Sequence, residues 1–341
     1  AGPAALSWTS AEIDIGVNRR ELRPDGTTVI GWNRAGPADR TAGILRVTRP
    51  GGEPVATVVN HACHGTILPP ENLQVSSEWP GVMRDIIGKE LGGVALFIQG
   101  AAGNINPDYE WGEGDPWEAV KTLGTKVGDA VVVAVRTGCR EIGGTPVGIS
   151  RREVMLPLET RDEARPGVRW LDTALFSRRL DAAGAGRRAT KFDEGEKPAT
   201  TYRKKVLQFA GIPTFFSFLT DRLLDWRYPW RSRAVVKDGR WALPMRISAV
   251  RVGDLTLAAF GAEVFTEIGT AVKASCPTPF AMFASITDGC IGYLPTAAAH
   301  DAGGYEVDDA PFLYRYPARL ARGCEATATD AAREVCRELW R

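Results

Sequence analysis

Residues 55–66 read Val-Ala-Thr-Val-Val-Asn-His-Ala-Cys-His-Gly-Thr, and they decide how the rest of the chain is interpreted. Val55 to Val59 predicts a buried strand, and Gly65 predicts a turn directly after it. His64 therefore lies where a strand passes into a loop, which is a usual place for a ligand or a catalytic group. A neutral imidazole there could bind a metal or move a proton near pH 7. One histidine packed in the core and one satisfied at the surface would explain the same pattern without any function.

Strands and helices alternate on both sides of this stretch. Residues 44–47 and 94–98 have the composition of further strands, and residues 80–90 have helical spacing. A second helix is predicted over 117–136, with Asp115-Pro116 as its cap and first turn. This strand–helix–strand–helix order predicts an α/β fold.

The second half of the chain returns to the same kind of pattern. Residues 246–260 predict a hairpin that turns at Gly253-Asp254. A helix over 266–275, a strand over 280–286 and a closing helix over 326–340 follow it.

The region 160–240 differs from its surroundings. Residues 151–240 hold 20 Lys and Arg against 12 Asp and Glu, although the net charge of all 341 residues is only +1. A net charge this close to zero gives no reason to expect nucleic-acid binding. Residues 214–226 could form an amphipathic helix that packs on the core, or a substrate lid, or a surface for lipid or a partner. We interpret the chain as one domain with a basic, aromatic insertion at about 160–240.

The six cysteines contain no C-x-x-C spacing, so a structural zinc knuckle is disfavoured. Cys324 with Cys336, or Cys276 with Cys290, could pair in an oxidising compartment, and the sequence leaves that open.

Polar residues gather at two further predicted strand ends. Residues 99–107 read Gln-Gly-Ala-Ala-Gly-Asn-Ile-Asn-Pro, which lacks P-loop or Rossmann spacing. Asn104 or Asn106 could donate a hydrogen bond to a developing oxyanion, although a plain tight turn explains the segment equally well. Glu263 could be a salt-bridged structural carboxylate or an oxygen ligand for zinc. Tyr293, further along the chain, is by default a packed aromatic residue.

Taken in order, these segments resemble the neutral/alkaline (non-lysosomal) ceramidase family over about residues 10–310. The resemblance implies zinc ligands at His64, Glu263 and Tyr293. It also implies an active-site tyrosine at Tyr305, which precedes Glu306, and an active-site arginine at Arg19 within Asn18-Arg19-Arg20. The fold so implied is α/β, a mixed-sheet ceramidase-like catalytic domain whose N-terminal part is missing from this chain.

This chain departs from the family pattern at two places. Asn106 replaces the family's nucleophile-like serine, and an amide cannot act as an activated nucleophile. Attack must then come from water activated by the metal, with Asn106 holding the substrate carbonyl or the water. The family's H-x-H ligand segment also has no counterpart before Arg19, and His61 should point away from His64 along an extended strand. We therefore expect a separate N-terminal chain, cut from the same precursor, to form a heterodimer and supply the other histidine.

The predicted function is a zinc-dependent hydrolase that cleaves a linear N-acyl amide bond of a small or lipid-like substrate. Zinc is assigned to His64, Glu263 and Tyr293, and the catalytic residues are Asn106, Tyr305 and Arg19. A non-catalytic binding or scaffold protein on the same fold, and an esterase or lactonase using the same site, remain alternatives. The resemblance slightly favours a secreted or periplasmic location over a cytoplasmic one.

Overall fold

The computed structural model describes residues 2–144, 146–160, 163, 170–172, 177–179, 234–314, 316 and 318–341. The chain forms two compact units. The first comprises Ala1–Leu156, Pro244–Ala310 and Arg322–Arg341, and the second comprises Pro157–Leu243 and Pro311–Ala321. The helix expected over 214–226 lies outside the described residues, and the single domain with an insertion stays a prediction.

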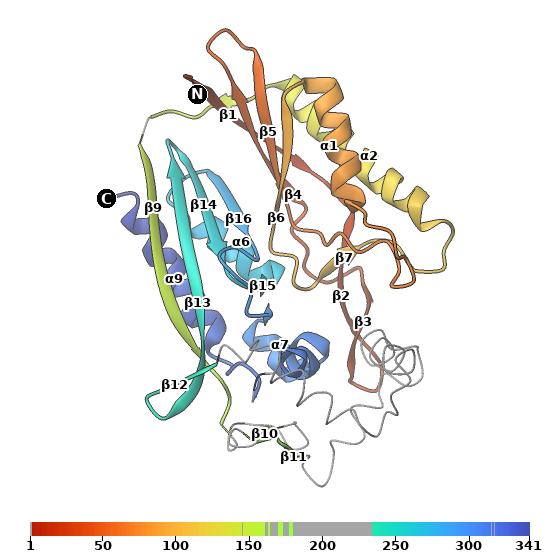
Figure 1. Cartoon of the computed structure of the whole chain (residues 1–341), viewed down its shortest axis with the longest axis vertical. Coiled ribbons are helices and arrows are strands. Elements are labelled where there is room, and N and C mark those ends of the chain that lie inside the picture. The colour runs from red at the N-terminus through yellow and green to blue at the C-terminus, as the bar shows by residue number, and fades with distance from the viewer. Residues whose placement is uncertain are drawn as a thin grey trace. The chain divides into compact units, whose positions relative to one another are not determined.

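The first unit contains a sheet with one helical layer on its outer face. Its strand order is β6-β5-β4-β1-β8, where the bounds are Val94–Gln99, Pro54–His61, Thr41–Thr48, Ala5–Glu12 and Arg140–Glu141. Helix α1 (Glu78–Leu91) connects β5 to β6, which are parallel, whereas the other neighbours are antiparallel. Helices α1 and α2 (Pro116–Thr137) lie together beside this sheet (Figure 1). Their apolar faces bury a core against it that includes Ile44, Val59, Trp79, Met83 and Val127.

A second mixed sheet packs against the first. It has the order β12-β13-β14-β16 with β9 beside β13, and the bounds are Val235–Lys237, Arg240–Val252, Leu255–Phe260, Phe280–Ala284 and Val147–Pro157. The core between the sheets contains Trp8, Leu255, Phe280 and Met282, and the Trp8 and Phe280 rings lie 5.9 Å apart. Helices α6 (Thr266–Ser275) and α9 (Cys324–Glu338) pack on the opposite face of β14 and β16. The layers therefore run helices, sheet, sheet, helices.

This architecture confirms the predicted α/β class and most of the predicted elements. Helix α6 has the expected bounds, and α1, α2 and α9 differ from theirs by one or two residues. The Asp115 carboxylate accepts a hydrogen bond of 2.9 Å from the Trp117 amide, as its N-cap position requires. The β13–β14 hairpin turns at Gly253-Asp254, where Gly253 has a φ of 57° that favours glycine.

Small sheets and short helices occupy one end of the first unit. Strands β3, β2 and β7 form one sheet, with bounds Thr28–Asn33, Gly16–Leu22 and Ile105–Pro107. Two short parallel strands, β15 (Glu263–Val264) and β17 (Tyr293–Leu294), form another. Helix α7 (Ala297–Ala302) and the π-helical turn η2 (Tyr305–Asp309) follow in the chain. Every candidate site residue belongs to these elements or to the loop after β5.

The cysteines are arranged differently from the two suggested pairings. Cys324 and Cys336 are both in α9, and their twelve-residue separation along a helix spans about 18 Å, which is too far for a disulfide. Cys276, at the end of α6, instead lies with its Sγ 3.9 Å from the Sγ of Cys336. Both are free thiols in this structure.

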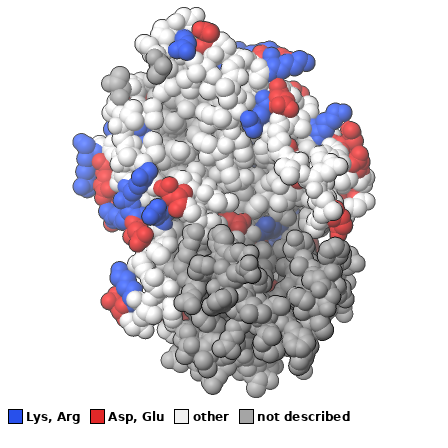
Figure 2. Space-filling model, viewed as in Figure 1, with Lys and Arg blue, Asp and Glu red and all other residues white. Residues whose placement is uncertain are grey.

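Lysine and arginine residues lie interspersed with aspartate and glutamate over the described surface in the view of Figure 2. Of the helices in the described part of the chain, none has both the length and the apolar character needed to cross a membrane.

Candidate active site

His64 is held in the loop after β5 by main-chain carbonyl and amide groups. The carbonyl oxygen of Ile105 lies 2.7 Å from Nδ1 of His64 and 3.4 Å from its amide nitrogen. The indole of Trp79 donates to the His64 carbonyl at 2.8 Å. Because a carbonyl oxygen can only accept, Nδ1 must hold the proton of this hydrogen bond. In the neutral ring, Nε2 is therefore the atom with a free lone pair.

Glu263 approaches this free nitrogen from β15. Its Oε2 lies 3.3 Å from Nε2 of His64, and both side chains are mostly buried. The Glu263 amide donates to the carbonyl of Gly292 at 2.8 Å, and Glu263 pairs directly with Tyr293 in the parallel β15–β17 register. Gly103 packs against the β15 backbone so closely that a Cβ there would lie 2.6 Å from the Glu263 carbonyl. Only glycine fits this approach, which joins the segment after β6 to the strand that holds Glu263.

Two acceptor atoms facing each other at 3.3 Å need a metal cation or a shared proton between them. Zinc has ligand atoms at about 2.0–2.1 Å, and a tetrahedral angle then separates two of them by about 3.3 Å. The Nδ1–H···O=C bond of His64 is also the usual support of a metal-bound imidazole. His64 and Glu263 thus fit two positions of a zinc shell, and Tyr293 lies beside Glu263 in the paired strand. Within the described ranges, no group of three or more His, Cys, Asp and Glu residues is placed to hold a metal, so a complete shell requires Tyr293 or another kind of ligand.

Arg19 lies on the bulged strand β2 and connects several candidate residues. Its Nε donates to Oε1 of Glu306 at 2.7 Å, and its Nη1 donates to Oδ1 of Asn106 at 3.2 Å. Its guanidinium carbon lies 5.3 Å and 5.9 Å from the ring centroids of Tyr293 and Tyr305. Burial is the largest single influence on Arg19 and lowers its pKa, but the charges and hydrogen bonds of Glu306 and Tyr293 together outweigh burial and raise the pKa above its ordinary value. Arg19 is therefore a permanent, buried cation.

Tyr293 and Tyr305 form an edge-to-face pair with ring centroids 5.7 Å apart. Burial raises the pKa of both hydroxyls, and the charge of Glu263 adds to this increase while that of Arg19 opposes it. Without a metal, both hydroxyls keep their protons at neutral pH and can donate hydrogen bonds. A cation bound beside Tyr293 would act in the opposite direction and favour the phenolate.

The two asparagines of the 103–107 segment have different surroundings. Asn104 is fully buried, accepts from the Thr266 amide at 2.9 Å and donates to Glu267 at 2.8 Å, so it fixes the start of α6. Asn106 pairs with Val17 in the β2–β7 register and uses its Oδ1 for Arg19. This orientation leaves the NH₂ group of Asn106 as the donor that faces away from Arg19.

The structure therefore brings together the residues named from sequence through a connected set of contacts. Glu263 contacts His64 and pairs with Tyr293, and Arg19 joins Tyr293, Tyr305 and Asn106. His61 packs with its ring edge against Trp79, and burial lowers its pKa to about 4.

Sequence reasoning assigned no role to Arg20, Glu306 or the Ile105 carbonyl. Arg20 follows Arg19 in the sequence and Glu306 follows Tyr305. Because Arg19 and Tyr305 were both assigned to the site, an ion pair between Arg20 and Glu306 could have been suspected. The Ile105 carbonyl belongs to the backbone, so no residue type indicates its role.

Comparisons with protein-family models and with curated proteins find no match. Two solved structures are similar in fold. One is the neutral ceramidase from Pseudomonas aeruginosa, with a TM-score of 0.59 and 16% identity over 98% of this chain and 52% of that chain. The other is a ceramidase complexed with C2, with a TM-score of 0.63 and 18% identity over 99% of this chain and 54% of that chain. The chain thus spans about half the length of these ceramidases and has a ceramidase-like fold.

Proposed function

We propose that this chain is a zinc-dependent hydrolase of N-acyl amides, with zinc held by His64, Glu263 and Tyr293. The observation that supports it most directly is the 3.3 Å separation between Nε2 of His64 and Oε2 of Glu263. Nδ1 of the same ring is hydrogen-bonded to the Ile105 carbonyl, so Nε2 is the nitrogen that can bind a metal. An imidazole nitrogen, a carboxylate and a phenol suit zinc better than magnesium or calcium, which prefer shells made only of oxygen. The ceramidase-like fold supports amide hydrolysis as the reaction class.

A zinc ion held by these residues would activate a water for attack, since zinc can lower the pKa of water to about 7, and would polarise a substrate carbonyl. Three protein ligands and one open position are the usual arrangement of a catalytic zinc site. The set proposed from this chain, His64, Glu263 and Tyr293, supplies the three protein ligands. An additional histidine from a separate N-terminal chain stays a prediction.

The other residues are proposed to bind and stabilise the acyl group. Arg19 is a permanent cation beside both tyrosines, and the NH₂ group of Asn106 is oriented by its bond to Arg19. Both can donate hydrogen bonds to negative charge that develops on the carbonyl oxygen. Tyr305 keeps its proton because burial raises its pKa, so it can donate that proton to the departing nitrogen.

Asn106 is not proposed as a nucleophile, because an amide has no activatable lone pair of the kind that a serine hydroxyl offers. The substrate class is a linear amide with an acyl chain, and lipid-like amides are the first compounds to test because of the fold. Truncated and water-soluble N-acyl amines should be included in the same panel.

The test combines metal analysis with a substrate panel. Purified protein is assayed for zinc by elemental analysis and for hydrolysis of N-acyl amides, matched esters and lactones. Amide hydrolysis that is lost with a chelator and restored by zinc is the expected result. Faster cleavage of esters or lactones would assign the same site to an esterase. Bound metal without hydrolysis of any compound, or no metal at all, would favour the non-catalytic alternative.

A further inference from the structure

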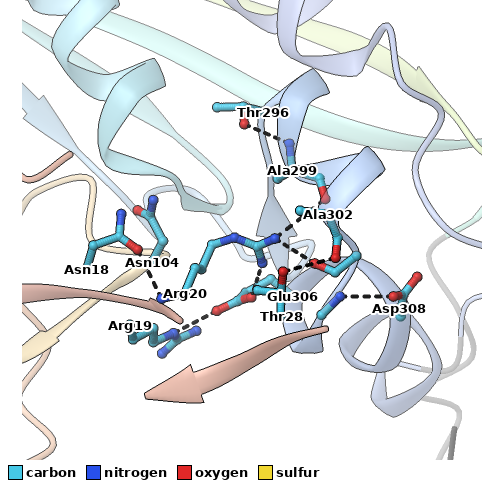
Figure 3. A network of polar contacts seen from close by, with 12 residues as sticks. Asn18, Arg19, Arg20, Thr28, Asn104, Thr296, Ala299, Ala302, Glu306 and Asp308 are labelled. Atoms are coloured by element: carbon cyan, nitrogen blue, oxygen red, sulfur yellow. Dashed lines mark hydrogen bonds and ion pairs between the residues drawn. The ribbon is translucent and has the colours of Figure 1, made fainter. Parts of the chain in front are cut away.

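We propose that Glu306 is a positioning residue that fixes the Arg19 guanidinium for the reaction. The proposal rests on the amide hydrolase function above and goes beyond it by assigning a role to a residue outside the ligand and donor sets. Glu306 is 2% exposed, and each of its carboxylate oxygens accepts from a different arginine. Oε1 accepts from Nε of Arg19 at 2.7 Å, and Oε2 accepts from Nη1 of Arg20 at 2.6 Å (Figure 3).

An irregularity in β2 makes this convergence possible. Consecutive side chains of a regular strand point to opposite faces, so Arg19 and Arg20 should not reach the same carboxylate. The β2–β3 register shifts between Asn18 and Arg20, which is the signature of a bulge. A bulge re-aims a side chain and is common beside active sites. The Arg19 amide, released from the regular ladder, donates to the Asn104 carbonyl at 2.9 Å.

The two arginines do not depend on Glu306 to the same degree. Arg20 also donates to the Gly303 carbonyl at 2.5 Å and lies over the Phe265 ring, with its guanidinium carbon 5.3 Å from the centroid. Within the described part of the chain, Arg19 forms one ion pair, with Glu306, and also donates to Asn106 at 3.2 Å. Loss of the Glu306 charge should therefore release Arg19 and leave Arg20 largely in place.

The Nη2 atom of Arg19 indicates what this orientation is for. It is buried and has no hydrogen-bond partner among the residues that the structure describes. Buried donors of this kind are rare and costly, so an acceptor is expected to reach it in the working enzyme. With Nε bonded to Glu306 and one N–H of Nη1 bonded to Asn106, both N–H groups of Nη2 are available to donate to an oxygen of the substrate.

Glu306 also connects Arg19 to Tyr305. Tyr305 and Glu306 are adjacent in η2. Turns of π-helix are rare in proteins, and those that occur are often at functional sites. The turn is closed at its start by the Gly304 amide, which donates to Asp308 at 2.9 Å. Glu306 thus joins the turn that holds Tyr305 to the strand that holds Arg19, and it sets both donors with one side chain.

The test compares Glu306→Gln with a matched variant of another buried Arg–Glu pair. Glu159 accepts from Arg319 at 2.6 and 2.8 Å, and both side chains are nearly inaccessible, so Glu159→Gln reports the general effect of neutralising such a pair. Arg20→Gln is the second control, because it disrupts the same network but spares the bond between Glu306 and Arg19. Each zinc-loaded protein is measured for kcat, KM, Tm, zinc content and the ¹⁵N–¹H signal of the Arg19 side-chain Nε, assigned with Arg19→Lys.

We expect Glu306→Gln to lower kcat by about 10²-fold with little change in KM or zinc content, because a misplaced donor lowers kcat far more than binding. The Arg19 Nε signal should shift or broaden in Glu306→Gln and remain in Arg20→Gln. Both controls should lower Tm and keep kcat within a few-fold of the parent. Equal kcat losses in Glu306→Gln and Glu159→Gln, or an unchanged Arg19 signal, would overturn the proposal. If the parent protein cleaves no amide, the proposed function fails, and the Nε signal alone still decides whether Glu306 holds Arg19.

Discussion

Nε2 of His64 and Oε2 of Glu263 lie 3.3 Å apart, although 199 residues separate them in the chain. His64 follows β5 of the first sheet, and Glu263 begins β15, which follows β14 of the second sheet in the chain. The packing of the two sheets therefore brings the residues together. The segment 103–107 supports this arrangement, because the Ile105 carbonyl contacts the His64 ring and the Gly103 amide donates to the carbonyl of Val264, the residue after Glu263.

The first prediction concerns metal content. Purified protein should contain about one zinc per site, and His64→Ala or Glu263→Ala should remove most of it, because each deletes a ligand from a three-residue set. Elemental analysis after gel filtration measures this directly. Glu159→Gln, which lies in the other compact unit, should keep its zinc. An active preparation without a transition metal would refute the assignment.

The second prediction concerns Asn106. Asn106→Ala should lower kcat/KM by about 10²–10³ because a donor to the carbonyl oxygen is lost. Asn106→Ser should not exceed the parent rate, because water is already the proposed nucleophile. Asn72→Ala is a suitable control, since the Asn72 side chain bonds within its own loop to Gln74. An acyl adduct trapped on residues 103–107 and detected by mass spectrometry would contradict this view.

The third prediction concerns acid stability and His61. Burial lowers the pKa of His61 from 6.5 to about 4, while Asp39 and Thr41 oppose the shift and Lys273 adds to it. Above pH 6.5 the ring is neutral in both folded and unfolded chains, so it has no effect on stability. As the pH falls from 6.5 towards 4, the unfolded chain binds a proton that the folded chain does not, and stability falls by up to about 3 kcal/mol. Urea unfolding of the parent and His61→Phe across this range should show a shallower pH dependence in the variant, and parallel curves would be the opposite outcome.

The fourth prediction concerns Cys276 and Cys336. Their Sγ atoms are 3.9 Å apart, and the hydrogen bond from Cys276 lowers the pKa of the Cys336 thiol. Oxidised glutathione should therefore convert the two thiols to a disulfide, with two molecules of reduced glutathione released. The link closes a loop of 60 residues between α6 and α9 and should stabilise the fold by about 2–4 kcal/mol.

Peptide mapping without reductant identifies this bond, and Tm with and without reductant measures its effect. Cys336→Ser should lose the difference in Tm, whereas Cys139→Ser should keep it. A link between any other two cysteines would show that the thiol pair does not react first.

Elements with a strong periodic pattern were predictable, and the short elements that build the site were not. The apolar spacing of 266–275 gives α6 its bounds, and the alternation before Gly253 gives the hairpin. Strands β15 and β17 have two residues each, which is too short for any pattern to indicate. The bulge in β2 is equally invisible, because it depends on the partner strand and not on residue type.

The candidate residues could be named because their order resembles a known family, but their partners could not. Glu306 lies 287 residues from Arg19, and Cys276 lies 60 residues from Cys336. Local sequence gives no information about such separations. Residue type alone did not distinguish Asn104 from Asn106, and only the family resemblance pointed to Asn106. The contacts of Asn104 with Thr266 and Glu267 show that its amide fixes the start of α6.

The carbonyl of Ile105 has a consequence for how this site tolerates change over time. Every amino acid has a backbone carbonyl, so substitution at position 105 need not remove the acceptor that fixes the His64 ring. A backbone carbonyl that supports a histidine ring cannot be recognised from the sequence, because it does not require a particular side chain at position 105. The two solved structures of similar fold are only 16–18% identical to this chain, and a backbone acceptor of this kind would not contribute to such a percentage. Comparisons of residue types cannot detect a support of this kind, whereas comparisons of backbone geometry can.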